Sequence, residues 1–222
     1  MNIRTLFLGL AAVLLFTGCA TSEHIDYTAF RNNTPHSVLV VVSHSESEEV
    51  NAIPSVLSSA ALPLSEAGYY VIPVTLANET FKSIGVRKAD EIKSIPHSRL
   101  KELFGADAVM YLTINEYQTN YVLLDSYFLV SVTAELVDLS TGKTLWKETS
   151  EDSNESMISG DIVSDAVGAV VKYGLNELMD VGNYLSVTNS YNLFTPDNSY
   201  LTNPILSGPY SPYYRKDKIL SK

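Results

Sequence analysis

Hydrophobic and polar positions along this chain follow three patterns: one unbroken apolar run at the N-terminus, apolar stretches of strand length, and stretches with apolar residues at helical spacing. The N-terminal run, residues 6–16, follows Arg4 and is shorter than the roughly 20 residues that a helix needs to cross a bilayer. A short positive segment before such a run is typical of a secretion signal. We therefore predict that residues 1–18 are a signal peptide.

Five stretches have the apolar pattern of β-strands. Residues 37–43 (SVLVVVS) are β-branched and unbroken, which is typical of a central strand that is buried on both faces. Residues 127–138 alternate between an apolar and a mixed face, and Gly142 in the link that follows favours a tight hairpin. The predicted strands, of which the last three are antiparallel, are residues 37–43, 69–74, 108–118, 127–138 and 143–151.

Apolar residues recur at helical spacing in other stretches. The first, residues 53–67, has Pro63 near its end and Gly68 as its terminator, and the last is amphipathic and is expected to run on toward residue 190. The predicted helices are residues 53–67, 77–84, 89–95, 97–104 and 161–179. This order of elements indicates an α/β (α+β) sandwich, in which one mixed sheet of about five strands carries helices packed on it.

The two ends of the mature chain lack such patterns. Residues 20–36 are polar and are predicted to be a tether, so that residues 37–190 form the α/β domain. Residues 191–222 contain four prolines, which forbid a long helix or a central strand, and form either an extended arm on the surface or a flexible tail. Their tyrosines either bind a partner, since tyrosine is favoured at interfaces, or pin the arm to the domain. The candidates for partner binding are Tyr200, Tyr210, Tyr213 and Tyr214.

Cys19 is the residue whose chemistry the sequence defines best. It is the only cysteine, so it cannot form an internal disulfide, and a free thiol would be a liability in an oxidising compartment. The small residues Thr17 and Gly18 lead to it, although Phe16 stands where lipoprotein signals more often have leucine. We predict that Cys19 becomes the lipid-bearing first residue, held by two or three acyl chains. Ala20 follows where an aspartate would favour inner-membrane retention, which favours the outer membrane, on either its periplasmic face or the cell surface.

Composition excludes some classes of partner. The net charge of −10 disfavours nucleic acid and anionic lipid surfaces, because neither attracts an acidic protein. No phosphate-binding glycine loop, nucleophile elbow or H-E-x-x-H site occurs in the chain. We therefore predict no cofactor and no bound metal.

Two weaker candidates for chemistry remain. His44 stands between Ser43 and Ser45, but neighbouring residues at a strand end point in opposite directions, which disfavours a catalytic arrangement. Acidic residues could bind a cation, but they lack the regular spacing of a calcium loop and are predicted to be solvated surface. These acidic residues are Glu46, Glu48, Glu49, Glu135 and Asp138. Trp146 is interpreted as a packing residue, and no catalytic site is predicted.

Four stretches carry a resemblance to a known family: LSEAGYYVIPVTLANETFKSIGV, LKELFGADAVMYLTINEY, AELVDLSTGKTLWK and the closing GPYSPYYRKD. Together they resemble a family of bacterial lipoproteins typified by a neisserial surface antigen considered as a vaccine component. This chain departs from the family pattern at residues 43–46, where relatives have Pro-Pro-x-Asn, and at Tyr210, where they have arginine.

A wider resemblance links the chain to three kinds of envelope domain. The segment G-A-D-A before a strand and the later L-V-D hairpin are similar to parts of the N-terminal domain of the Tol-system β-propeller protein, the curli-channel lipoprotein and a lipoprotein activator of peptidoglycan synthases. This resemblance implies a mixed sheet flanked by helices that serves as a protein-binding module. It also implies a curli-channel-like lipoprotein as a partner.

Three hypotheses of function follow. The first is a non-enzymatic accessory lipoprotein that binds a protein partner in envelope assembly, secretion or transport. The second is a structural homo-oligomer associated with a curli-channel-like secretion complex. The third, and the least favoured, is an envelope hydrolase that uses His44 and a nearby carboxylate.

Overall fold

A computed structural model describes residues 25–122, 125–154 and 181–221 of the 222-residue chain. Cys19 and the predicted helix over residues 161–179 lie outside the described residues. In the part that is described, no helix has both the length and the apolar character needed to cross a membrane.

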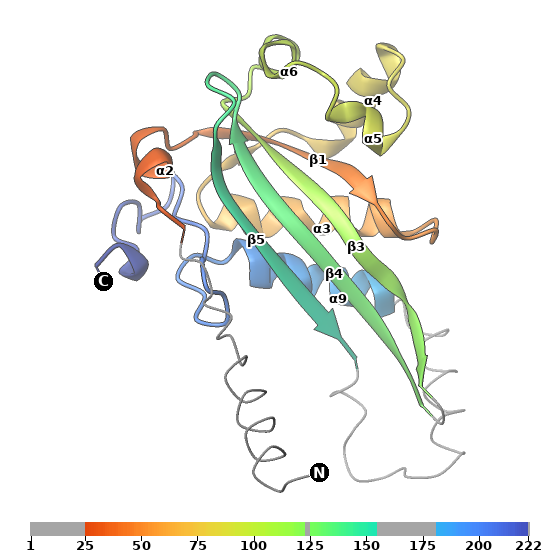
Figure 1. Cartoon of the computed structure of the whole chain (residues 1–222). Coiled ribbons are helices and arrows are strands. Elements are labelled where there is room, and N and C mark those ends of the chain that lie inside the picture. Colours follow the sequence, from red (N-terminus) through yellow and green to blue (C-terminus); the bar gives the residue numbers. More distant parts are fainter. Residues whose placement is uncertain (1–24, 123–124, 155–180, 222) are drawn as a thin grey trace, which may run out of the picture.

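The centre of the molecule is one mixed five-stranded sheet, as the sequence predicts (Figure 1). Its strand order is β2-β1-β3-β4-β5, in which β1 is parallel to both of its neighbours and the last three strands form an antiparallel meander. The strands are β1 (Ser37–Ser45), β2 (Tyr70–Val71), β3 (Ala108–Val122), β4 (Asp125–Asp138) and β5 (Thr144–Ser153).

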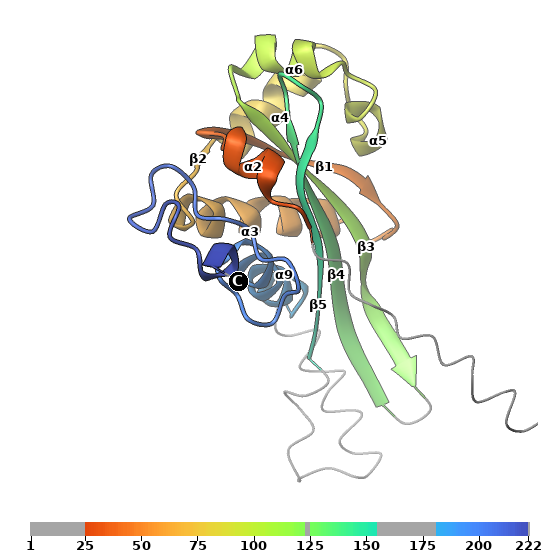
Figure 2. The same ribbon diagram turned by 60° about the vertical axis from the view of Figure 1, so that its left-hand side comes forward.

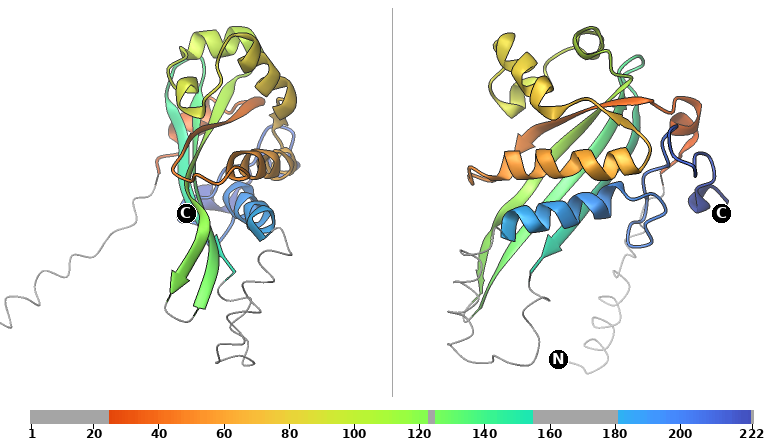
Figure 3. Two further views of the ribbon diagram at one scale, coloured as in Figure 1. Left: turned by 90° about the vertical axis from the view of Figure 1, so that its right-hand side faces the viewer. Right: turned by 180° about the vertical axis from the view of Figure 1, so that it is seen from behind.

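Helices cover both faces of this sheet. Figures 2 and 3 show α3 and α9 side by side along one face, whereas α4, α5 and α6 gather on the other face at one end. The helices are α2 (Thr28–Asn32), α3 (Ala52–Glu66), α4 (Val74–Ser83), α5 (Ala89–Ile92), α6 (His97–Phe104) and α9 (Val181–Phe194), with a short 3-10 helix, η2 (Lys218–Ser221), near the C-terminus.

Two hydrophobic cores result, and β1 contributes to both. Val38, Val40 and Val42 pack under α3 and α9, whereas Leu39 and Val41 pack under the second group of helices. Successive side chains of a strand point to opposite faces, so a strand buried on both sides must be apolar at every position. The unbroken SVLVVVS run is therefore explained, and its prediction as a central strand is confirmed.

The predicted strand over residues 69–74 is wrong in length. Only Tyr70–Val71 pairs with β1, because Pro73 has no N–H to donate to a ladder and α4 begins directly after it at Val74. The β3–β4 pair is longer than expected and continues to Val122, so these strands extend beyond the segments that the alternation had identified.

Residues 25–36, expected to be part of the tether, are packed on the domain instead. Phe30 in α2 and Tyr27 before it are buried in the main core, and the Tyr27 hydroxyl donates to the carbonyl oxygen of Pro204 at 2.7 Å. The apolar residues of this stretch are few and show no sustained period, which explains the error. The boundary at residue 190 also moves, because α9 continues to Phe194.

Candidate functional site: the C-terminal arm and the cavity beside it

The C-terminal arm, defined here as residues 195–221, is built into the domain. Ile205 and Leu206 are buried in the main core, and the carbonyl oxygen of Asn203 accepts the Trp146 indole N–H at 2.7 Å. Trp146 is itself fully buried, so its interpretation as a packing residue is confirmed. Of the two alternatives for this segment, the arm laid across a surface is the one that the structure shows.

The arm crosses the end of α3 at two glycines, Gly68 and Gly208. The Gly208 N–H donates to the carbonyl oxygen of Ala67 at 2.8 Å, and the Tyr210 N–H donates to that of Gly68 at 3.0 Å. A Cβ added at Gly208 would lie 2.3 Å from the Gly68 oxygen, so no side chain fits between the two segments. The crossing brings the E-A-G-Y-Y stretch and the closing G-P-Y-S-P stretch, on both of which the family resemblance depends, into contact.

Two buried tyrosines hold the arm by neutral hydrogen bonds. The Tyr69 hydroxyl donates to the carbonyl oxygen of Leu206 at 2.5 Å, and burial, followed by the nearby Asp217 carboxylate, raises its pKa well above 10. Burial likewise raises the pKa of Tyr27, with Glu148 and Asp217 adding to the effect. Asp217 itself accepts the N–H of Ser207 at 2.8 Å. Both tyrosines therefore stay protonated and remain donors.

The four tyrosines predicted to bind a partner differ in their environment. Tyr214 is half-buried, and the pKa of its hydroxyl is lowered, first by a hydrogen bond with Thr34. Tyr200, Tyr210 and Tyr213 are 90%, 66% and 69% exposed. Of these four tyrosines, Tyr214 contacts the domain, while the other three rings face solvent.

A cavity of about 670 Å³ lies between α2 and the end of the arm. Its lining is mainly polar and basic: Thr28, Arg31, Asn32, Arg215, Lys216, Asp217, Lys218 and Leu220. Sequence reasoning missed this cavity because the two segments are at opposite ends of the chain. The only local signal was the R-K-D-K run near the C-terminus.

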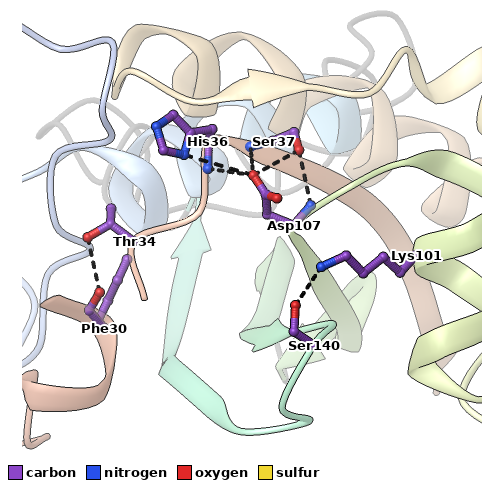
Figure 4. A network of polar contacts seen from close by, with 7 residues as sticks. All are labelled: Phe30, Thr34, His36, Ser37, Lys101, Asp107 and Ser140. Carbon is purple, nitrogen blue, oxygen red and sulfur yellow. Dashed lines mark hydrogen bonds and ion pairs between the residues drawn. The ribbon is translucent and has the colours of Figure 1, made fainter. Parts of the chain in front are cut away.

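A network around Asp107 explains the G-A-D-A stretch (Figure 4). The Asp107 Oδ2 atom accepts the backbone N–H groups of His36 (3.0 Å) and Ser37 (3.2 Å), and Ser37 Oγ accepts the N–H of Asp107 at 3.0 Å. These bonds tie the start of β1 to the turn before β3. Figure 4 also shows Lys101 Nζ donating to Ser140 Oγ at 2.6 Å, which joins α6 to the β4–β5 hairpin. The role of Asp107 is thus to position strands.

His44 does not form a catalytic arrangement among the described residues. Its Nδ1 lies 2.6 Å from Asp90 Oδ1, and both side chains are exposed. The Ser43 hydroxyl is buried and donates to the carbonyl oxygen of Leu112, and that of Ser45 donates to the carbonyl oxygen of Ser47. A histidine–carboxylate pair without a bonded nucleophile has the components of a surface contact only.

The carboxylates considered for cation binding have structural roles or face solvent. Asp138 Oδ1 accepts the N–H groups of Ser140 and Thr141 and closes the β4–β5 turn, and Glu135 accepts the Thr144 hydroxyl. Three others, Glu46, Glu48 and Glu49, are exposed after β1. Within the described ranges, no three histidine, cysteine or acidic side chains come together in a way that could hold a metal ion.

A mixed sheet with helices packed on it is a fold found among bacterial lipoproteins, and the comparisons with known proteins identify the family. Residues 25–210 match the family described as "Putative lipoprotein GNA1162-like", and the chain belongs to this family. A lipoprotein of Neisseria meningitidis serogroup B, NMB1124/NMB1162, is 43% identical over 212 residues, covering 93% of this chain and 96% of that protein. The resemblance to a neisserial lipoprotein family is therefore confirmed, and the chain is a membrane-anchored lipoprotein.

The solved structure of a neisserial member of this family agrees with this assignment. The crystal structure of lipoprotein GNA1162 from Neisseria meningitidis is 41% identical, covers 65% of this chain and 98% of its own, and has a TM-score of 0.52. The PelC dodecamer from Paraburkholderia phytofirmans is 20% identical, with 72% and 88% of the two chains covered and a TM-score of 0.42.

Proposed function

We propose that this chain is an outer-membrane lipoprotein, anchored through lipid on Cys19, that has no enzymatic activity and binds another envelope protein through its C-terminal arm. Ala20 after the lipidated cysteine supports the outer membrane. The observation that carries the proposal is the display of exposed tyrosines on a segment whose backbone is already fixed.

The binding surface that we propose is the tyrosine surface, consisting of Tyr70, Tyr210 and Tyr213, all exposed. Tyr70 on β2 donates its N–H to the carbonyl oxygen of His36, and the His36 ring lies 6.0 Å from that of Tyr210. His36 therefore links the sheet edge at Tyr70 to the arm at Tyr210. A tyrosine buries about 150–250 Å² on contact, and a fixed backbone loses little further entropy on binding.

Site-specific crosslinking in cells tests this function. A photoreactive phenylalanine is placed at Tyr210 or Tyr213, with Tyr184 as the control, since Tyr184 on α9 is also exposed (54%) but belongs to another surface. We expect the probes at Tyr210 and Tyr213 to crosslink to the same envelope protein. The probe at Tyr184 should not crosslink to it. In a further experiment the photoreactive phenylalanine is placed at Tyr70. The double substitution Tyr210→Ser/Tyr213→Ser should then abolish its crosslink to this protein, whereas Tyr184→Ser should preserve it.

The outcomes separate the hypotheses. A crosslink to a second copy of the chain would support the homo-oligomer instead, and sedimentation would then give its size. A crosslink to a curli-channel-like lipoprotein would identify the partner that the sequence resemblance implies. Equal capture at Tyr184, or none at either arm position, would contradict binding through the tyrosine surface. Labelling with palmitate, lost in Cys19→Ser, tests the anchor separately.

A further inference from the structure

The cavity between α2 and the end of the arm is basic although the chain as a whole has a net charge of −10. Arg31 comes from α2, and the arm contributes Arg215, Lys216 and Lys218, so four cations line one cavity. Charges on a protein surface are screened over about 8–10 Å at physiological salt, so a ligand there experiences these four side chains rather than the distant acidic residues. The acidic composition therefore does not exclude an anionic ligand at this place.

Three of the four cations of the cavity, Arg31, Arg215 and Lys216, form no ion pair within the part of the chain that the structure describes. Among the described lining residues, Asp217 is the only acid, and its side chain is buried (4% exposed) with Oδ1 bonded to the Ser207 N–H. The cavity therefore carries an excess of positive charge.

The basic side chains stand on an ordered segment. Arg215 has a φ of +61°, a left-handed conformation that residues with a Cβ rarely adopt, and its guanidinium carbon lies 5.1 Å from the Tyr214 ring centre. The N–H of Lys218 donates to Asp197 Oδ1 at 2.8 Å, and Lys216 Nζ donates to the carbonyl oxygen of Pro212 at 3.1 Å. Contacts of this kind reduce the freedom that binding a ligand would otherwise remove.

The cavity is also close in sequence to the predicted lipid anchor, Cys19. Ile25 is fixed to the domain by its N–H bond to Asn203 Oδ1 at 2.9 Å, and it follows Cys19 by six residues, which span at most about 21 Å. Helix α2 begins three residues later and forms one wall of the cavity. This step rests on the proposed lipidation of Cys19, and it places the basic side chains within reach of the membrane surface.

We propose that this cavity binds a phosphate group, supplied by the headgroup of an anionic phospholipid in the membrane that holds the lipid anchor. Arginine and lysine are the side chains that bind phosphate oxygens by charge-assisted hydrogen bonds. A volume of about 670 Å³ is also within the range of small-molecule sites and accommodates a headgroup. Such binding would orient the domain on the membrane in addition to anchoring it.

Vesicle binding tests the proposal. The mature chain from residue 19 carries Cys19→Ser, so that no acyl chain attaches it to lipid, and is mixed with vesicles of phosphatidylcholine alone or with phosphatidylglycerol. We expect binding only to the phosphatidylglycerol vesicles. Arg31→Gln/Lys216→Gln should weaken it about 25-fold, since each basic residue near an anionic surface contributes about fivefold. The control Arg87→Gln/Lys143→Gln removes the same charge from exposed positions outside the cavity and should have little effect.

A second experiment distinguishes the two possible sources of phosphate. Inorganic phosphate is titrated by calorimetry against the same proteins without vesicles, and thermal unfolding verifies that each variant is folded. Phosphate binding that is lost in Arg31→Gln/Lys216→Gln, without vesicle binding, would support the site and assign it to a soluble phosphate. No binding in either experiment, or an equal loss of binding in the control variant, would overturn the proposal. Neither result depends on crosslinking at the tyrosine surface or on palmitate labelling, so the two proposals fail separately.

Discussion

At the scale of single residues, two buried tyrosines with raised pKa values have different surroundings. Tyr69 donates its hydroxyl to the carbonyl oxygen of Leu206. The Tyr111 hydroxyl is buried without a hydrogen-bond partner among the described residues, and burial, followed by Glu135, raises its pKa to about 12. A buried hydroxyl that forms a hydrogen bond stabilises the fold. One without a partner loses its hydration without gaining a hydrogen bond, and so destabilises the fold.

Replacement by phenylalanine should therefore affect these tyrosines differently. Tyr69→Phe leaves a buried carbonyl without its donor and should lower the free energy of unfolding by about 1–2 kcal/mol. Tyr111→Phe keeps the ring and removes the unpaired hydroxyl, so the free energy should stay within about 0.5 kcal/mol or rise. Urea unfolding measures both. A loss for Tyr111→Phe as large as that for Tyr69→Phe would show that its hydroxyl has a partner.

The sequence could not have separated these residues, nor the tyrosines of the arm. From the sequence, Tyr210, Tyr213 and Tyr214 are equivalent candidates. In a segment without a helical or strand period, the exposure of a side chain depends on whether it packs against the domain, and the sequence does not show this. Cys19 differs in this respect. Its chemistry follows from the residues immediately before it and from the absence of a second cysteine, so it remains a prediction from sequence alone.

At the scale of elements, the contact between the end of α3 and the arm depends on an absent side chain. Gly68 has a φ of +95°, and a Cβ there would lie 2.4 Å from the backbone nitrogen of Ser211. Gly85 provides a matched comparison, with a φ of +88° and nothing within 4 Å of the added atom. The two glycines share the conformational requirement, and only Gly68 has the close contact.

Substitution by alanine should separate these two effects. Gly85→Ala should lower the free energy of unfolding by about 1–2 kcal/mol, the cost of a left-handed conformation for a residue with a Cβ. Gly68→Ala has the same cost and an overlap with backbone atoms, which adds about 1–3 kcal/mol. Chemical denaturation of both variants measures the difference. Equal losses would mean that the arm moves away from α3 without cost.

Most elements could be predicted because the spacing of apolar residues along the chain follows the face of each element that is buried. The apolar run of β1 and the alternation of β4 identified central strands, and helical spacing identified α3 and α6. The failures include α2 and the end of β2. In α2 a single buried residue, Phe30, faces the core, and at β2 the chain leaves the sheet after two residues because of Pro73. The cavity was missed for a related reason, since it requires knowing that α2 and the arm lie together.

At the scale of the whole molecule, the two ends of the described chain complete one core. Tyr27 and Phe30 from one end and Ile205 and Leu206 from the other pack in the same cluster as the sheet and α9. The arm is therefore not a separable appendage. A deletion of residues 191–222 removes core residues together with the exposed tyrosines, so it does not test partner binding alone. Point substitutions of exposed tyrosines are the appropriate test.

This arrangement predicts the effect of shortening the chain. Ending it at residue 202 removes Ile205 and Leu206, each contributing about 1.5–3 kcal/mol by burial, and the acceptors of Trp146 and Tyr69, about 1 kcal/mol each. The total of about 5–8 kcal/mol is comparable to the whole stability of a domain, about 5–15 kcal/mol. We expect the shortened protein to be unfolded or to lose its cooperative thermal transition.

A milder truncation provides the control. Ending the chain at residue 217 retains Asp217 with its bond to the Ser207 N–H and removes only η2 and the last residue. Its thermal transition should remain cooperative, with a midpoint only a few degrees lower. Circular dichroism and limited proteolysis would compare the two proteins. If the chain ending at residue 202 unfolded at the same temperature as the full one, the residues up to 202 would be sufficient for the fold, and the rest of the arm would serve binding alone.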